Sequence, residues 1–195
     1  MRGFYLCVLL LLFLAQPFQT TAVASAPLVP PLPPEQWDRE AHLWLSRAAV
    51  AEASWVAERD HALIAWTLAY RWRDAVKRLP NLRFVNVVRS YCSALKVYGI
   101  RTPRHDWVRS LPSVDEAWPE SVPESYIRHW HTVQARMLKW GAGEIEDPSH
   151  GRVRHWGSPS AALPDRARAQ RAIDEGLWVL LDLGDTKNDF YGYAQ

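Results

Sequence analysis

The sequence has 195 residues, with 23 Lys and Arg against 21 Asp and Glu, and a formal net charge of +2 at pH 7. Its basic residues are interspersed with acidic ones, so the charge pattern argues against nucleic acid as a partner. A chain of this length has room for one hydrophobic core of ordinary size, and we expect a single domain.

The first 24 residues are typical of a signal peptide. Arg2 precedes an apolar run over residues 6–14, and small residues follow up to Ala24. The run is too short to cross a bilayer as a helix, so we expect no retained membrane anchor. Cleavage after Ala24 predicts a secreted or periplasmic protein that begins at Ser25.

Residues 25–36 hold five prolines and are expected to form an extended leader into a domain over residues 37–195. Removal of Cys7 with the signal peptide leaves Cys92 as the only cysteine, so no intrachain disulfide is expected. Cys92 adjoins Tyr91 on the apolar side of a predicted helix. We therefore expect a buried, unpaired thiol that serves packing.

Helical spacing of apolar residues starts at Ala41, and Asp38 can cap the beginning of this first helix. A second helix is predicted from Asp60 to about Arg78. Its middle, residues 62–70, is apolar on nearly every side, which is typical of a helix at the centre of a fold. A third helix is expected over residues 84–95.

Residues 99–120 contain three prolines and scattered charges, which predict a loop. Residues 121–124, Ser-Val-Pro-Glu, match a capping box and predict a helix that ends at Gly141. A short polar helix is expected near residues 165–175, and the apolar residues 177–181 indicate a buried strand or extended segment. The predicted fold class is therefore mostly α, with a small irregular or extended C-terminal part.

Glu52 continues the apolar stripe of the first helix, four residues after Ala48. A carboxyl group there loses hydration, which favours the protonated form that a general acid needs. The other interpretation is a buried ion pair with Arg71 or Arg73 near the end of the second helix. The position of Glu52 alone leaves both interpretations open.

The seven histidines lack the spacing of a metal site. His129 and His131 would point to different sides of a helix, and the pair His150 and His155 has no acidic or cysteine ligand at a zinc-peptidase offset. We expect no metal and no cofactor. The eleven tryptophans are a second unusual feature. We expect most of them in the core and two or three in a groove, where they would stack on flat ligand faces such as sugar rings.

Four segments carry a family resemblance. Residues 45–53, Leu-Ser-Arg-Ala-Ala-Val-Ala-Glu-Ala, precede the alanine-rich residues 61–71, which end in arginine. Residues 147–159 contain Asp-Pro-Ser-His-Gly and an aromatic stretch, and residues 184–191 form a polar-aromatic tail. In this order the segments resemble the lysozyme-like cell wall hydrolases of the spore-cortex-lytic type, over most of residues 41–191.

The resemblance implies a lysozyme-like helical domain that cleaves peptidoglycan glycan strands after N-acetylmuramic acid, as a muramidase or a lytic transglycosylase. Glu52 corresponds to the catalytic glutamate and would act as general acid and base. A lytic transglycosylase needs no second carboxylate, because the 6-hydroxyl of the substrate attacks the anomeric carbon. The resemblance also implies a monomer without cofactor, in which a cleft is lined by Arg71, His155, Trp156, Asn188 and Tyr191.

The chain departs from the family at two places. The family usually has a Gly and a second Glu directly after the catalytic Glu-Ala, whereas this chain has Ser54-Trp-Val. Arg152 stands where the family prefers a small residue, and Glu58 could replace the second Glu only if the loop bends differently. Two alternatives to an enzyme therefore stay open: a non-catalytic peptidoglycan-binding protein on the same fold, and a structural exported domain whose tryptophans are all core.

Overall fold

The computed structural model describes residues 30–96, 102–157 and 163–194. As predicted, the chain is mostly helical, with a small sheet formed by its C-terminal part. The elements, in chain order, are η1 (Pro34–Gln36), α2 (Arg39–Ala53), α3 (Glu58–Val76), α4 (Phe84–Tyr91), η2 (Ser93–Leu95), α5 (Pro103–Ser110), α6 (Glu124–Gly141), β1 (Val153–Gly157), α7 (Leu163–Asp174), β2 (Trp178–Leu180) and β3 (Asp189–Tyr193).

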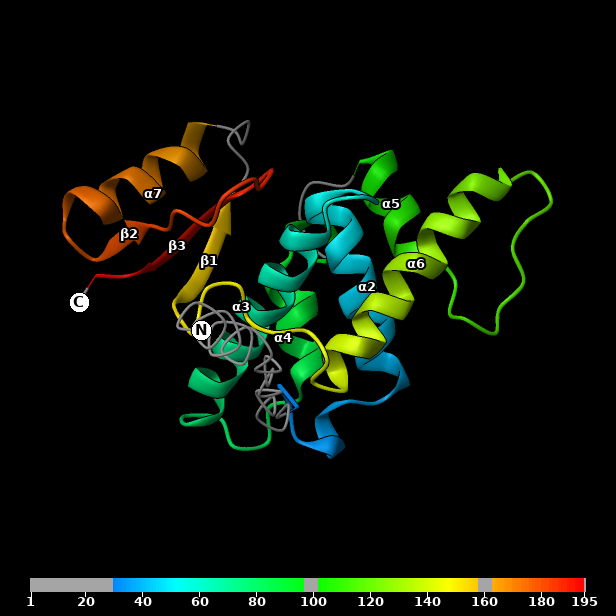
Figure 1. Cartoon of the computed structure of the whole chain (residues 1–195), viewed down its shortest axis with the longest axis horizontal. Coiled ribbons are helices and arrows are strands. Elements are labelled where there is room, and N and C mark those ends of the chain that lie inside the picture. Colours follow the sequence, from blue (N-terminus) through cyan, green and yellow to red (C-terminus); the bar gives the residue numbers. More distant parts are fainter. Residues whose placement is uncertain (1–29, 97–101, 158–162, 195) are drawn as a thin grey trace, which may run out of the picture.

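Figure 1 shows α2 to α6 gathered into one helical body, with the sheet and α7 beside it. The central helix is α3, as its apolar sequence predicted: Leu63, Ile64 and Leu68 have no exposed surface. Two tryptophans of α6, Trp130 and Trp140, are also fully buried. No helix within the described ranges is long and apolar enough to cross a membrane.

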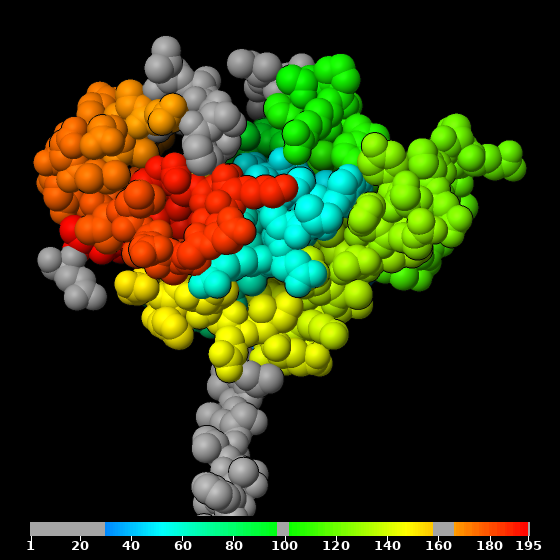
Figure 2. Space-filling model, turned by 45° about the horizontal axis from the view of Figure 1, so that its top comes forward, coloured from blue at the N-terminus to red at the C-terminus, as the bar shows by residue number. Residues whose placement is uncertain are grey.

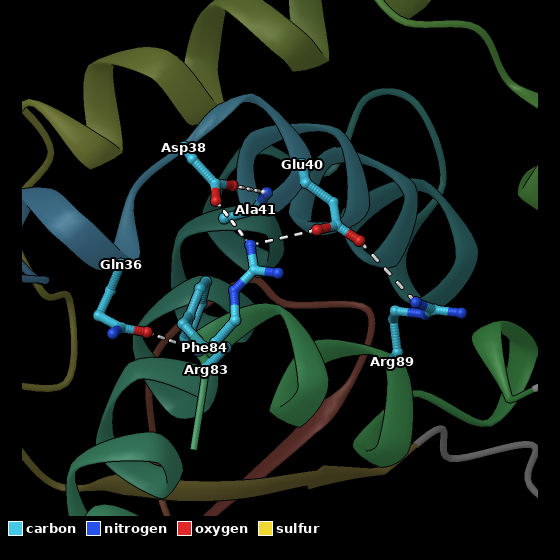
Figure 3. Close-up of polar contacts among 7 residues, drawn as sticks. All are labelled: Gln36, Asp38, Glu40, Ala41, Arg83, Phe84 and Arg89. Atoms are coloured by element: carbon cyan, nitrogen blue, oxygen red, sulfur yellow. Dashed lines mark hydrogen bonds and ion pairs between the residues drawn. The ribbon is translucent and has the colours of Figure 1, made fainter. Parts of the chain in front are cut away.

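The start of α2 is tied to the start of α4 by side-chain contacts (Figure 3). Asp38 caps α2 as predicted, because its Oδ1 accepts a hydrogen bond from the Ala41 amide at 2.8 Å. Its Oδ2 accepts from Arg83 Nη2 at 2.6 Å, and Gln36 Oε1 accepts from the Phe84 amide at 2.9 Å. These contacts set the direction in which the chain enters both helices.

The predicted signal peptide lies outside the described residues, and so does the first part of the leader. Residues 30–36 of that leader pack against the domain. Leu32 is 3% exposed, and Arg73 Nη2 donates to the Pro31 carbonyl oxygen at 2.8 Å. The end of the proline-rich segment therefore belongs to the folded domain and is not a free spacer.

The prediction of a loop over residues 99–120 is wrong for residues 103–110, which form α5. Thr102 Oγ1 accepts a hydrogen bond from the His105 amide at 3.2 Å and caps the helix. Pro103 takes a first-turn position, where a missing N–H costs nothing and the fixed φ suits the helix. A proline in this place starts a helix, although it would break one further along.

The capping box predicted for α6 is also wrong. The helix begins at Glu124 with Pro123 as its N-cap, and no side chain caps it. The reason is Pro123 itself, because a residue that precedes proline is disfavoured in the helical region. Ser121 therefore lies two residues before the N-cap position and does not cap the helix.

The sheet is antiparallel with strand order β1-β3-β2. His155 lies opposite Tyr191 and Trp156 opposite Phe190 in the β1–β3 pair. The strand expected within residues 177–181 is present as β2. It is not buried as expected, because Leu177 is 56% exposed and Leu180 58%. The apolar run belongs to an edge strand, which pairs with β3 along one side only.

Candidate functional site

Glu52 lies in the last turn of α2, and its side chain is partly exposed. One carboxyl oxygen, Oε1, accepts from Cys92 Sγ at 2.8 Å, and the other, Oε2, accepts from Trp156 Nε1 at 3.1 Å. The main-chain oxygen of Glu52 accepts from Asn188 Nδ2 at 3.0 Å. Residues from the segment just after α4, from β1 and from the C-terminal tail thus meet at one glutamate.

The two arginines considered as ion-pair partners of Glu52 have other contacts. Arg71 Nε donates to the Arg154 carbonyl oxygen at 2.9 Å, and its guanidinium lies 3.8 Å from the centre of the Tyr91 ring. Arg73 donates to the leader. Neither forms an ion pair with Glu52 in the part of the chain that the structure describes. The buried ion pair was therefore the wrong interpretation.

Cys92 is fully buried and forms no disulfide, as expected. It follows the last residue of α4 with an extended backbone, φ −73° and ψ 118°, so its side chain does not continue the helical stripe. Burial raises the pKa of the Cys92 thiol, and the neighbouring Glu52 carboxylate raises it further. The thiol is thereby kept protonated as a hydrogen-bond donor, a role beyond the packing expected of it.

Several aromatic side chains lie beside this carboxyl group, and one of them, Trp156, contacts it. Tyr91 lies with its ring centre 4.8 Å from that of Trp156, and its hydroxyl contacts His155 Nδ1. The ring centre of His155 in turn lies 4.7 Å from that of Trp178. Burial, with the charges of Arg71 and another arginine, lowers the pKa of His155 to about 4. The imidazole is therefore neutral at neutral pH.

Three of the residues expected to line a cleft are buried. Trp156 is 5% exposed, Asn188 4% and Tyr191 9%. Their faces are not open to a sugar ring, because β1 packs on α3 and the β1–β3 pairing draws both strands onto the helical body. His155 and Arg71 are half-buried. Trp156 and Asn188 hold Glu52 in place, which corrects their expected role as cleft walls.

Sequence reasoning missed Asp60, which organises the tail beside Glu52. Its side chain is 1% exposed and accepts hydrogen bonds from the main-chain amides of Lys187 and Asn188. It also accepts from Asn188 Nδ2 at 2.9 Å, the same nitrogen that reaches Glu52. The sequence offers a weak signal for this: Asp60 directly precedes the stretch of α3 that is apolar on nearly every side, whereas its neighbours Glu58 and Arg59 are exposed.

The connection between α2 and α3 is held by His61. Its Nε2 lies 2.6 Å from the Ser54 carbonyl oxygen, and its Nδ1 lies 3.0 Å from Arg136 Nη1. Arg136 also pairs with Glu58. Glu58 is thus occupied by α6, which does not support it as a substitute for the second glutamate of the resembled family.

Ser54 ends α2 with φ 68° and ψ −174°, a region that almost only glycine adopts. It stands where the resembled family has glycine. We predict that Ser54→Gly stabilises the protein by about 1 kcal/mol, because the strain of a side chain at this φ is removed. Urea denaturation measures the change.

The matched control is Ser125→Gly on the exposed side of α6, where the same substitution should destabilise by roughly 0.5 kcal/mol, because Gly is a poorer helix former than Ser. Equal destabilisation by both substitutions would contradict strain at Ser54.

We predict that Trp156→Ala destabilises the protein by roughly 3–5 kcal/mol, because a large buried side chain is lost. Trp107→Ala is the control, since Trp107 is 37% exposed and should cost about 1 kcal/mol or less. Chemical denaturation of the two variants distinguishes the two positions. An unchanged stability of Trp156→Ala would mean that this ring is not part of the core.

Stability should also decrease in acid. Burial lowers the pKa of His42, His61 and His155, the last to about 4, whereas an unfolded histidine titrates near 6.5. Below about pH 6.5 the unfolded chain binds more protons than the folded one, so the free energy of unfolding falls as the pH falls toward 4.

Denaturation at several pH values measures this slope. His61→Gln should reduce it, and His131→Gln, at an exposed histidine of α6, should leave it unchanged. If the free energy of unfolding falls with pH equally in the wild type, His61→Gln and His131→Gln, the buried His61 does not contribute to the loss of stability in acid.

The histidines singled out in the sequence do not come together. His131 is exposed on α6 and His150 lies in the turn before β1. Among the described residues, no group of three or more His, Cys, Asp or Glu is placed to hold a metal ion. Compared with protein-family models, curated proteins and solved structures, the chain matches none of them.

Proposed function

We propose that the protein cleaves peptidoglycan glycan strands and that Glu52 is its general acid and base. One observation carries the proposal: the Glu52 carboxyl group is partly exposed, and each of its oxygens is held by a neutral donor. The donors are the Cys92 thiol and the Trp156 indole. Each carboxyl oxygen has a second lone pair, so a proton can sit on the group while both hydrogen bonds persist.

The absence of a cationic partner among the described residues matters for proton transfer. A glutamate in an ion pair is fixed in its charged form, because protonation would leave the cation unpaired. Because Glu52 has no cationic partner among the described residues, gaining or losing a proton leaves no cation unpaired. Glu52 can therefore donate a proton to a leaving oxygen and take one back in the next step, as a single acid and base must.

In the proposed reaction, protonated Glu52 gives its proton to the glycosidic oxygen as the bond from that oxygen to the anomeric carbon breaks. The 6-hydroxyl oxygen of the same sugar then bonds to the anomeric carbon, and its proton returns to Glu52. The product is an anhydro sugar, and no water is consumed. This lytic transglycosylase route uses one carboxyl group only.

The surroundings favour this route over hydrolysis with two carboxyl groups, in which the second activates water or attacks the sugar. The two nearest acidic residues along the chain are engaged elsewhere. Glu58 is paired with Arg136, and the buried Asp60 accepts hydrogen bonds from the tail. Neither is available as a nucleophile beside Glu52.

The same chemistry implies where the protein works. Peptidoglycan lies outside the cytoplasm, and residues 1–24 have the pattern of a signal peptide. We therefore propose a secreted or periplasmic protein that acts as a monomer on glycan strands without a cofactor. Whether water or the 6-hydroxyl attacks, Glu52 has the same first role.

A non-catalytic peptidoglycan-binding protein is the second candidate. The burial of Trp156, Asn188 and Tyr191 favours it, because these residues offer little surface to a substrate around the acid. The third candidate, a purely structural domain, has less support. Trp107 is exposed and Trp55 half-buried, so the tryptophans are not all core.

We predict that Glu52→Gln abolishes clearing of purified peptidoglycan in a zymogram, with a loss of about 100-fold or more, because the proton donor is removed. Glu58→Gln is the matched control and should clear like the wild type. Mass spectrometry of soluble products should show ends that are lighter by one water than hydrolysis products.

Each outcome separates the candidates. Clearing by Glu52→Gln at the wild-type rate would refute the assignment of the acid. A wild type that binds peptidoglycan without clearing it would support the non-catalytic candidate.

A further inference from the structure

A second group of aromatic side chains lies on the other side of the α2 end and has no part in holding Glu52. Trp55 follows α2, Trp107 comes from α5, and Tyr126 and His129 come from α6. The ring centre of Trp55 lies 5.4 Å from Trp107, 6.0 Å from Tyr126 and 6.3 Å from His129. We call these four residues the aromatic platform.

Three of the four side chains of the platform are exposed to solvent. Trp107 is 37% exposed and Tyr126 44%, and His129 is also exposed. Beneath them, Trp55 packs against the fully buried Trp130, with ring centres 6.5 Å apart. One side of the group is thus anchored in the core. The other side presents apolar surface to solvent, a pattern that marks binding surfaces.

The platform is rigidly linked to the proposed catalytic residue. Trp55 lies three residues after Glu52. Arg109 of α5 donates to the carbonyl oxygens of Ala94 and Lys96, at the end of the segment that begins with Cys92. The helix that carries Trp107 is therefore fastened to the segment that holds Glu52.

Figure 2 shows how this face is arranged. The α2–α3 junction, in cyan, lies between the red C-terminal segment on one side and the green α5 and yellow-green α6 on the other. An extended ligand that crosses the junction would meet α5 and α6 on one side and the tail beside Glu52 on the other.

We propose that the aromatic platform is a binding subsite for a polymer of N-acetylated amino sugars. A pyranose ring has a face of C–H bonds and an edge of hydroxyl groups. The exposed Trp107 ring would cover the C–H side, with Trp55 supporting it edge-to-face, and the Tyr126 hydroxyl and the His129 imidazole would bind the polar edge. In its choice of ligand this inference rests on the proposed function.

The charges around the platform favour a polymer of this kind over nucleic acid. Arg109 pairs with Asp106, and Arg128 pairs with Glu124 at 2.8 Å. These rim charges neutralise each other in pairs, whereas nucleic acid binding on aromatic rings needs a basic groove for the phosphates. A largely uncharged polymer chain suits paired charges and ring faces.

The test uses the full chain with Glu52→Gln, so that no cleavage confuses binding. Two probes are used, the N-acetylglucosamine hexamer by calorimetry and purified peptidoglycan sacculi by sedimentation. Trp107→Leu with Tyr126→Leu removes the flat rings and keeps apolar bulk. We expect this double variant to bind both probes roughly tenfold more weakly, or worse. Tyr193→Leu, at a 58% exposed tyrosine on β3, should bind normally.

Melting temperatures check that the variants fold, and Trp107→Leu alone replaces the double variant if the latter does not. Undiminished binding of both probes by a folded variant would overturn the subsite. So would a preference for a soluble peptidoglycan stem peptide, or for single-stranded DNA, over the hexamer.

The proposed function can fail separately. If the wild type does not clear peptidoglycan but the platform variants lose binding, the subsite stands and the catalytic proposal falls. If the wild type clears peptidoglycan and the platform variants bind both probes as tightly as Glu52→Gln alone, the subsite falls and the catalytic proposal stands.

Discussion

The buried carboxylate of Asp60 is the constraint on which the rest of the site depends. A carboxylate removed from water must be compensated by hydrogen bonds, or its burial costs several kcal/mol. Here the compensation comes from the amides of Lys187 and Asn188, together with the position of Asp60 in the first turn of α3, where the helix dipole favours negative charge. The C-terminal tail is therefore held against the helical body by the need to satisfy one side chain.

This constraint reaches Glu52 through Asn188. One amide nitrogen of Asn188 lies within hydrogen-bond distance of both the Asp60 carboxylate and the Glu52 main chain, so the tail cannot move without disturbing the end of α2. The sheet adds the second restraint, because Trp156 reaches Glu52 from β1, which pairs with the strand that follows Asn188. The side chains of Trp156 and Asn188 are thus used to hold Glu52. Their burial is the consequence of that use.

The end of α2 divides the aromatic residues into two sets with different physical roles. Trp156 contacts the Glu52 carboxyl group and packs with Tyr91 and His155. Trp55 and Trp107 belong to the aromatic platform, and Trp55 packs on the fully buried Trp130. Under the proposed function, the first set would position the group that transfers the proton and the second set would bind the polymer. The strained Ser54 lies between the two sets, where the chain must turn sharply to serve both.

Apolar spacing along the sequence was enough to predict α2, α3, α4 and α6 and the place of Glu52 on its helix, although the helix expected over residues 84–95 ends as α4 at Tyr91. The short polar helix near residues 165–175 and the Asp38 cap followed from other local signals. Each of these features depends on contacts a few residues away. What the sequence left open was decided by packing between distant segments. The sequence pattern did not predict α5, because a proline such as Pro103 is found both after the end of a helix and in the first turn of the next one. The apolar run at residues 177–181 indicates a strand but not whether neighbours cover it. Trp156 and Trp107 look alike in sequence, yet one is buried against Glu52 and the other exposed. A periodic pattern specifies which face of its own element a side chain occupies. Only the tertiary structure decides which element lies against that face, because that choice is set by the shape and hydrogen bonds of the partner.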